Sequence, residues 1–338
     1  MTLHIGMVYD LRSAYLAEGY APEDVAEFDA ETTIEAIVAA LSGLGHRVER
    51  IGHGRELCRR LAAGDRWDLV FNFAEGRRGR SREAQVPALL ELFEIPYTFS
   101  DPLVCAVTLD KAVAKRLVRS AGLATPAFRL VNREADLAAL DLAFPVFAKP
   151  VAEGTGKGID DRSRIETREE LAAACRRLRQ RFRQPVLVEE YLPGREFTTG
   201  ILGTEDAARV LGTMEIRARS NAPTLDYSFE MKERCEEFVE YTALERGPLR
   251  AEVEALALAA YRALQCRDAG RVDIRLDRQG RPAFLEVNPL PGLNPAHSDL
   301  PMIAAQNGLS FDGLIGAIVE SALERVPGAG RPATPKPS

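Results

Sequence analysis

Four charged or strongly polar side chains recur at alternate positions within residues 270–288, a stretch otherwise rich in apolar residues. The stretch is typical of two short strands joined by a turn, and side chains alternate between the two faces of a strand. One face therefore carries Arg271 and Asp273 from the first strand with Glu286 and Asn288 from the second. The opposite face is apolar in both strands and must be the core.

The turn between the two strands decides which side chains face each other. With a two-residue turn, Arg271 lies opposite Glu286, and Asp273 lies opposite Phe284. Asp273 and Glu286 are then diagonal neighbours, about 7–8 Å apart at the backbone. Two carboxylates with the amide of Asn288 beside them suit Mg²⁺, which prefers one or two carboxylates plus substrate phosphates. An Arg–Glu salt bridge on a solvated face is the alternative interpretation.

Two glycine-containing loops accompany this hairpin. Residues 153–158, EGTGKG, directly follow an apolar run that ends near Lys149. They match neither a Walker A motif nor a dinucleotide-binding fingerprint, and an ordinary flexible turn would explain them alone. Their place after a lysine-bearing strand is, however, typical of a loop that covers bound phosphate groups. The second loop leaves the hairpin at residues 288–295, where Gly292 allows backbone N–H groups to approach a developing negative charge.

Apolar periodicity predicts different architectures in the two halves of the chain. Strand and helix patterns alternate through residues 1–100, which predicts a parallel sheet flanked by helices. Later strand patterns lie at 145–151, 185–192 and 196–216, and the last of these contains two consecutive antiparallel strands. A helix that begins at a capping box, at Thr167, interrupts them. The predicted fold class is α/β followed by α+β.

Composition argues against several kinds of protein. A net charge of −6 argues against a nucleic-acid or anionic-membrane partner. There is no run of 18 or more apolar residues and no signal-peptide pattern, so no membrane association is expected. The five cysteines are scattered without metal-ligand spacing, as in a reduced, cytoplasmic protein. The 338 residues suffice for two or three lobes.

Several motifs, in order, resemble the ATP-grasp superfamily and, within it, the D-alanine–D-alanine ligases. They are TLDKAVAKRLVRSAGLATP, FAKPVAEGTGKG, LVEEYLPGREFT, RVDIRLD and FLEVNPLPGLNP followed by HSDLPMIAAQNGLSF. The resemblance implies an ATP-grasp fold with an N-terminal parallel α/β lobe. Its expected divisions are an N-terminal substrate domain at 1–105, a central lobe at 106–188, a C-terminal lobe at 189–326 and a disordered tail at 327–338.

The resemblance implies a role for each matching residue. The phosphates of ATP would be held by Lys111, Lys149 and the loop residues Glu153, Gly154, Thr155 and Gly156. The adenine would meet Glu189, Glu190 and the backbone near Leu192, and the ribose hydroxyls would meet Glu196. Two Mg²⁺ or Mn²⁺ ions would be bound by Asp273, Glu286 and Asn288.

The remaining implied roles concern the reacting groups. Arg271 and the amide of Gly292 would stabilise the tetrahedral intermediate, and Ser298 would hold the carboxylate of the second substrate. A segment that resembles the family's lid would bring Lys232 to the γ-phosphate and close the site with Tyr227. The implied reaction joins an amino-acid-like carboxylate to an amine through an acyl phosphate, releasing ADP and phosphate. By analogy with the family, a homodimer is expected.

The N-terminal part departs from the family pattern. D-alanine–D-alanine ligases carry a Ser/Ala-Glu-His-Glu-Val-Ser-like segment after the first strand, and residues 10–32 show no such match. Glu75 stands where the family has a histidine, and four arginines follow it between residues 77 and 82. These arginines are either solvated loop charges or readers of an acidic or larger first substrate. We therefore expect a product other than D-alanyl-D-alanine.

Three alternatives remain open. One is a true D-alanine–D-alanine ligase. Another is a non-catalytic ATP-binding module, although nucleotide binding alone does not require Arg271, Asp273, Glu286 and Asn288 together. The third is a phosphotransferase that stops at the acyl phosphate. Phosphate release that depends on an added amine would separate a ligase from the last two.

Overall fold

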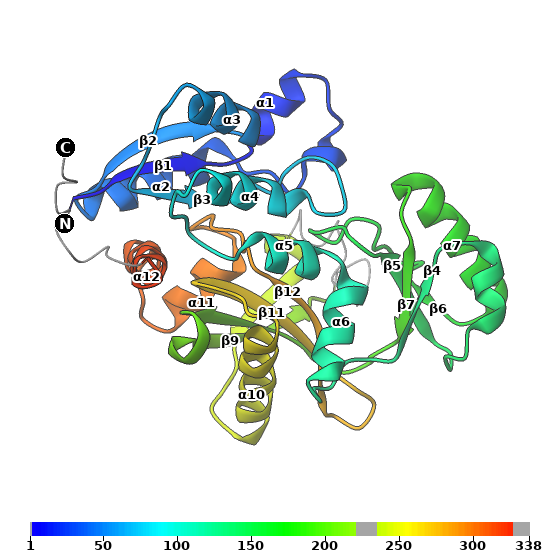
Figure 1. Cartoon of the computed structure of the whole chain (residues 1–338). Helices are drawn as coiled ribbons and strands as arrows, with labels where there is room; N and C mark the ends of the chain where they lie inside the picture. The colour runs from blue at the N-terminus through cyan, green and yellow to red at the C-terminus, as the bar shows by residue number, and fades with distance from the viewer. Residues whose placement is uncertain (1, 221–234, 327–338) are drawn as a thin grey trace.

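The computed structural model describes residues 2–220 and 235–326, which form three β-sheets arranged one after another along the chain (Figure 1). The N-terminal sheet is parallel and has the order β2-β1-β3, with strands β1 (His4–Val8), β2 (Arg47–Gly52) and β3 (Leu69–Asn72). The helices that follow or connect these strands are α1 (Arg12–Ala17), α2 (Glu31–Gly43), α3 (Gly54–Ala62) and α4 (Gln85–Leu92).

Both faces of this parallel sheet are buried. Ile5 and Met7 pack with α2 on one face, and Val8 and Val70 pack with α3 and α4 on the other. A parallel sheet covered by helices on both sides is the arrangement that alternating strand and helix patterns predict. The predicted α/β architecture of the first hundred residues is confirmed.

The central sheet is antiparallel, with the order β4-β7-β5-β6. Its strands are β4 (Phe128–Val131), β5 (Val146–Pro150), β6 (Arg164–Ile165) and β7 (Val186–Glu190), and helix α7 (Arg168–Phe182) packs against it. The predicted capping box is present, because Thr167 accepts from the backbone N–H of Glu170 and Glu170 accepts from that of Thr167. Several α7 arginines are solvated and pair with surface carboxylates, as the sequence suggests.

The C-terminal sheet is antiparallel and has the order β10-β9-β8-β11-β12. Its strands are β8 (Glu196–Leu202), β9 (Arg209–Ala218), β10 (Val239–Ala243), β11 (Ala269–Leu276) and β12 (Pro282–Asn288). The remaining helices are α5 (Pro102–Leu109), α6 (Lys111–Ser120), α9 (Cys235–Phe238), α10 (Pro248–Ala263), α11 (Asp299–Gln306) and α12 (Phe311–Glu324). Helices α6 and α10 pack on one face of the sheet and α11 packs on the other.

The predicted divisions at residues 105, 188 and 326 stay predictions. Val118 of α6 shares a core with Val272 and Phe284 of the C-terminal sheet. Helix α6 therefore packs with the C-terminal sheet, although it precedes the central sheet in sequence. Predicted tail residues 327–338 lie outside the described part of the chain.

The hairpin of β11 and β12 has a different register from the predicted one. Asp273 lies directly opposite Glu286, and Arg271 lies opposite Asn288. The loop between the strands is longer than two residues, spanning 277–281, and a β-bulge shifts the register after Asp273. Phe284 consequently lies opposite Ile274 in the core, so its predicted place on the polar face is wrong. The two carboxylates are direct cross-strand neighbours, closer than the predicted diagonal.

Within residues 2–220 and 235–326, no single helix has both the length and the apolar character needed to cross a membrane. Helices α11 and α12 pass that test only as a pair, and the chain bends by 108° between them.

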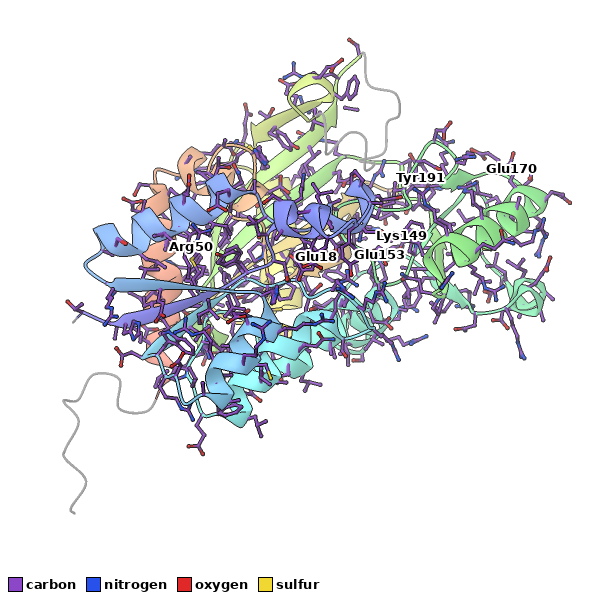
Figure 2. All side chains as sticks on the ribbon, turned by 90° about the horizontal axis from the view of Figure 1, so that it is seen from above. Glu18, Arg50, Lys149, Glu153, Glu170 and Tyr191 are labelled. Carbon is purple, nitrogen blue, oxygen red and sulfur yellow. The ribbon has the colours of Figure 1, made fainter. Side chains whose placement is uncertain are left out.

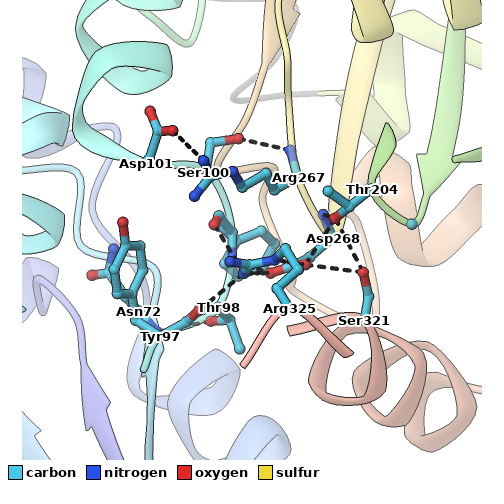
Figure 3. A network of polar contacts seen from close by, with 12 residues as sticks. Asn72, Tyr97, Thr98, Ser100, Asp101, Thr204, Arg267, Asp268, Ser321 and Arg325 are labelled. Carbon is cyan, nitrogen blue, oxygen red and sulfur yellow. Dashed lines mark hydrogen bonds and ion pairs between the residues drawn. The ribbon is translucent and has the colours of Figure 1, made fainter. Parts of the chain in front are cut away.

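A buried carboxylate joins the N-terminal lobe to the C-terminal sheet. Asp268, fully buried, lies immediately before β11 and accepts from the backbone N–H of Phe99 at 2.7 Å. It also accepts from Nη2 of Arg325 at 2.6 Å and from the hydroxyls of Thr204 and Ser321 at 3.2 and 2.9 Å (Figure 3). One side chain thus links the segment after β3, the end of β8, the start of β11 and the end of α12.

We predict that Asp268→Asn lowers the free energy of unfolding by about 2–4 kcal/mol, because it removes the charge that Arg325 faces and places an NH₂ among hydrogen-bond donors. Urea unfolding at pH 7 measures the loss. Glu324→Gln is the control, since Glu324 is exposed and adjacent in sequence to Arg325, the ion-pair partner of Asp268. A loss below about 1 kcal/mol, typical of a surface pair, would contradict this role.

Candidate active site

A cleft of about 800 Å³ lies between the central and C-terminal sheets. Lys149 and Glu189 line it from the central sheet, and Asp273 and Glu286 line it from the C-terminal hairpin. Viewed from above, Lys149, Glu153 and Tyr191 gather where the central lobe meets the rest of the molecule, far from Glu170 on α7 (Figure 2). The structure therefore brings residues predicted for ATP phosphates and for metal to one place.

Two lysines share one buried carboxylate in this cleft. Nζ of Lys149 lies 2.7 Å from Oε1 of Glu189, and Nζ of Lys115 lies 2.9 Å from Oε2. Burial alone raises the pKa of Glu189, but the two ammonium groups hold it below its usual range. Burial lowers the pKa of Lys115 to about 8, although Glu189 opposes that shift. Lys149 also lines the cleft, where its ammonium group can donate to phosphate oxygens.

Lys115 lies behind the cleft and positions Glu189, a role that the sequence analysis missed. It is fully buried on α6, one turn after Lys111, and also donates to the backbone oxygen of Phe284 at 3.2 Å. A lysine at i+4 from a predicted phosphate ligand was the available signal. The predicted adenine contact of Glu189 stays a prediction, and its carboxylate is already engaged by the two lysines.

The residues predicted to bind metal form a compact group of hard oxygen ligands. Asp273 accepts from the hydroxyl of Thr198 at 2.8 Å and from Arg271 at 3.0 Å, while Glu286 lies 3.2 Å from Nζ of Lys111. In the part of the chain that the structure describes, no three acidic, histidine or cysteine side chains converge as a complete site. Two carboxylates and the Asn288 amide fit Mg²⁺, which takes its other ligands from phosphates and water.

The nucleoside end of the cleft combines apolar walls with acidic groups. Leu192 and Leu285 line it, and Phe147 stacks against Tyr191 with ring centroids 6.4 Å apart. Leu285 reaches the cleft because of the bulge in β12. The predicted ribose ligand Glu196 also lines the cleft, and its carboxylate lies 3.6 Å from Arg275. Glu190 borders the same cleft. A flat heterocycle between apolar side chains with a carboxylate near its sugar fits this arrangement.

The glycine-rich loop is held from the N-terminal lobe. Glu27 accepts from the backbone N–H of Gly154 at 2.6 Å and lies 3.0 Å from Arg82 and 3.3 Å from Lys157. Thr155 and Gly156 of the same loop have positive φ angles of 51° and 68°. Arg82 also donates to the backbone oxygen of Ala152 at 2.9 Å. Glu27 therefore fixes the loop that would cover the phosphates.

Two expectations about the N-terminal lobe need correction. Arg82 is buried, so it is neither a solvated charge nor free to read an acidic substrate. Glu27 lies within the segment for which no family-like glutamate was expected, yet it reaches the site. An Ala-Glu pair shortly before helix α2 was the signal, and its distance from β1, with helix α1 in between, obscured it.

A second pocket, of about 880 Å³, adjoins the other end of the hairpin. Arg271, Asn288, Gly292 and Ser298 all line it, as does Glu75. A side chain at Gly292 would begin 2.9 Å from the hydroxyl of Ser298, so glycine permits the close approach of these two residues. The structure thus brings together the residues predicted to stabilise the tetrahedral intermediate, Arg271 and Gly292, and those predicted to meet the substrates, Glu75 and Ser298.

Arg271 is fixed in this pocket by three acceptors. It donates to Asp299 and, at 3.0 Å, to Asp273. With its amide oxygen turned toward Arg271, Asn288 accepts from Nε at 3.3 Å. Asp299 was not identified from the sequence; its place one residue after Ser298 gave no sign that it faces β11.

The second pocket is markedly acidic on the side of the N-terminal lobe. Glu75, Glu83 and Glu27 all line it. Burial raises the pKa of Glu75 well above its ordinary range, and the nearby carboxylates of Glu83 and Glu27 raise it further. Burial likewise raises the pKa of Glu83 to about 7, against the attraction of Arg82. Tyr227 and Lys232, predicted to close the site, lie outside the described residues.

Comparison with known proteins assigns this arrangement to a family. The D-ala D-ala ligase C-terminus family matches residues 117–320. A D-alanine–D-alanine ligase from Alcanivorax borkumensis is 34% identical over 93% of this chain and 94% of its own length. The chain belongs to the D-alanine–D-alanine ligase family. It is an ATP-grasp carboxylate–amine ligase, as the motifs suggested.

Other relatives and solved structures agree in fold. A protein of Sinorhizobium fredii named y4sG is 36% identical over 78% of this chain and 76% of its own length. The D-alanine–D-alanine ligase from Bacillus anthracis complexed with ATP has a TM-score of 0.71 at 22% identity, covering 96% of this chain and 98% of that protein. VanG D-Ala:D-Ser ligase from Enterococcus faecalis has a TM-score of 0.73 at 22% identity, with coverages of 95% and 100%.

The comparisons bear on the expected product. The related ligases support the alternative of a true D-alanine–D-alanine ligase better than the expectation of a different amino-acid pair. They support ATP and a divalent metal as family requirements, and small amino-acid substrates as the substrate class.

We predict that Glu83→Gln stabilises the unliganded protein by about 1–3 kcal/mol at pH 8 and by much less at pH 4.5. The pKa of Glu83 is raised from 4.5 to about 7. Between these two pH values the folded protein therefore keeps a proton on Glu83 that the unfolded chain has lost. The destabilising charge is absent below pH 4.5, builds as the pH rises and is complete above about pH 7. Urea unfolding at both pH values measures the difference, with exposed Glu18→Gln as control. Equal stabilisation at the two pH values would contradict the prediction.

Proposed function

We propose that this ligase joins the carboxylate of one amino acid to the amine of a second through an acyl phosphate, releasing ADP and phosphate. The observation that carries the proposal is the position of the β11–β12 hairpin between two pockets. Asp273 and Glu286 line the phosphate end of the first pocket, and Arg271 and Asn288 line the second. A γ-phosphate and a substrate carboxylate would therefore meet at one pair of strands.

The chain's own residues supply positioning and charge. Lys111 and Lys149 hold phosphate oxygens, and phosphoryl transfer requires little more than such positioning and charge stabilisation. A free carboxylate is a poor acyl donor, and its phosphorylation provides a leaving group for the attacking amine. Arg271 and the N–H of Gly292 stabilise the oxyanion that forms when the amine adds. Magnesium held by Asp273, Glu286 and Asn288 neutralises phosphate charge when bound.

D-alanine is the first candidate for both substrates. The relatives that span nearly the whole chain carry the name D-alanine–D-alanine ligase, which supports the same pair here. A second candidate is a pair that contains a different amino acid. Glu75 supports it, because a carboxylate in the histidine's place changes the charge beside the first substrate. A cytoplasmic location and a homodimer belong to the proposal by family analogy.

We predict that the purified protein releases ADP and phosphate only when Mg²⁺ or Mn²⁺ and a suitable amino-acid pair are both present. The measurement is product analysis after incubation with ATP and pairs of D- or L-amino acids, beginning with D-alanine alone. Formation of AMP and pyrophosphate would contradict the acyl-phosphate route. Phosphate release without an amine acceptor would indicate a phosphotransferase, and nucleotide binding without turnover of any pair would indicate a binding module.

We predict that Glu286→Gln keeps the fold and lowers turnover by about 10²–10³, because it removes one charge where phosphate charge must be neutralised. Turnover is measured with the best pair found, and circular dichroism checks the fold. Glu252→Gln, an exposed change on α10, is the control. Full turnover combined with a clear loss of stability would instead make the Lys111–Glu286 contact a structural salt bridge.

A further inference from the structure

We propose that Glu75 and Glu83 form a subsite for a primary ammonium group on the side chain of an amino-acid substrate. The substrate class is a diamino acid, such as ornithine or lysine. This inference rests on the proposed function and specifies which amino acid the second pocket favours. Nothing in the names of the relatives suggests a basic substrate.

The position of Glu83 is the first argument. Its side chain is only 8% exposed, yet it lines both the second pocket and a smaller cavity that it shares with Lys111 and Glu286. In residues 2–220 and 235–326, neither Glu83 nor Glu75 has a hydrogen bond or ion pair through its carboxylate. Two carboxylates therefore border the space where substrate binds, without a compensating partner from those parts of the chain.

The neighbouring charged groups are already engaged. Glu27, the third carboxylate of the pocket, faces Arg82 and Lys157. Arg271, the guanidinium of the same pocket, is held by Asp299 and other acceptors. Arg82 and Lys111 attract Glu83 electrostatically, but their direct contacts are with other groups: Arg82 donates to Glu27 and to the backbone of Ala152, and Lys111 lies beside Glu286.

A ligand cation would remove an energetic penalty. Glu83 is buried and Glu75 is half-buried, and desolvation together with repulsion from neighbouring carboxylates raises the pKa of each carboxyl. A primary ammonium group has three donors, so it can bridge two carboxylates with charge-assisted hydrogen bonds. Two such carboxylates in a substrate pocket lower the stability of the free protein, and a ligand that pairs with them offsets that loss.

The α-ammonium group of an ordinary amino acid is the competing explanation. Every amino acid carries one, so a subsite for it would serve alanine and ornithine alike. A side-chain subsite instead separates ornithine from norvaline, which has the same carbon chain without the second ammonium group. This pair of compounds isolates the proposed interaction and requires no change in the protein.

The experiment measures kcat/KM for ornithine and norvaline, each as D- and L-isomer, alone and mixed with D-alanine, with ATP and Mg²⁺. We expect ornithine to exceed norvaline at least tenfold for the accepted isomer. Glu75→Gln and Glu83→Gln should each reduce that ratio several-fold, whereas exposed Glu18→Gln should leave it unchanged. Calorimetric binding of both compounds with a non-hydrolysable ATP analogue gives the same comparison without turnover.

The outcomes separate this inference from the proposed function. Amide formation from neutral amino acids without any preference for ornithine would overturn the subsite and leave the ligase intact. Equal losses for ornithine and norvaline in both variants would assign the carboxylates to the α-ammonium group and also overturn it. A preference for arginine over ornithine would overturn the ammonium class. Failure of every pair to form an amide, with ornithine still bound more tightly than norvaline, would instead contradict the proposed function.

Discussion

The buried carboxylate of Asp268 is the interaction on which the arrangement of the site depends most. It lies directly before β11 and is bonded to the backbone of Phe99 from the N-terminal lobe and to Arg325 at the end of α12. A buried charge with a full set of donors is rigid, because each alternative position leaves a donor or the charge unpaired. The strand that carries Arg271 and Asp273 therefore begins at a fixed point relative to the lobe that carries Glu75.

From that fixed point the hairpin separates two environments. Its apolar face packs on α6 and α10, and its polar face borders both pockets. The bulge in β12 is central to this division, because it turns Phe284 into the core and Leu285 toward the nucleotide cleft. It also leaves Asp273 and Glu286 directly opposite each other, where two like charges would repel unless cations accompany them. Lys111 and Arg271 provide part of that compensation, and a divalent ion held by these carboxylates would supply more.

The sequence predicted those parts of the site that lie in contiguous motifs. The alternation in β11 and β12 identified the polar face, and alternating strand and helix patterns identified the parallel sheet. The register was missed because a bulge leaves no trace in residue periodicity. Glu27, Glu83 and Lys115 were missed for another reason. Lys115 contacts Glu189 and Glu27 contacts Gly154, and both partners are distant in sequence, so the local signals at Lys115 and Glu27 did not specify these contacts. Glu83 has no local signal, and only the fold places it at the second pocket.

The two pockets treat buried charge differently. In the first pocket, Lys149 and the buried Lys115 behind it pair with Glu189, and Lys111 pairs with Glu286, so these lysines are balanced by carboxylates of the protein. In the second pocket, Glu75 and Glu83 leave an excess of negative charge on one wall. The unpaired carboxylates of the second pocket disfavour the free protein and would be relieved by a ligand of opposite charge, so binding there discriminates between ligands by charge. The first pocket instead offers lysines that are already paired, whose ammonium groups phosphate oxygens can share with the protein's carboxylates.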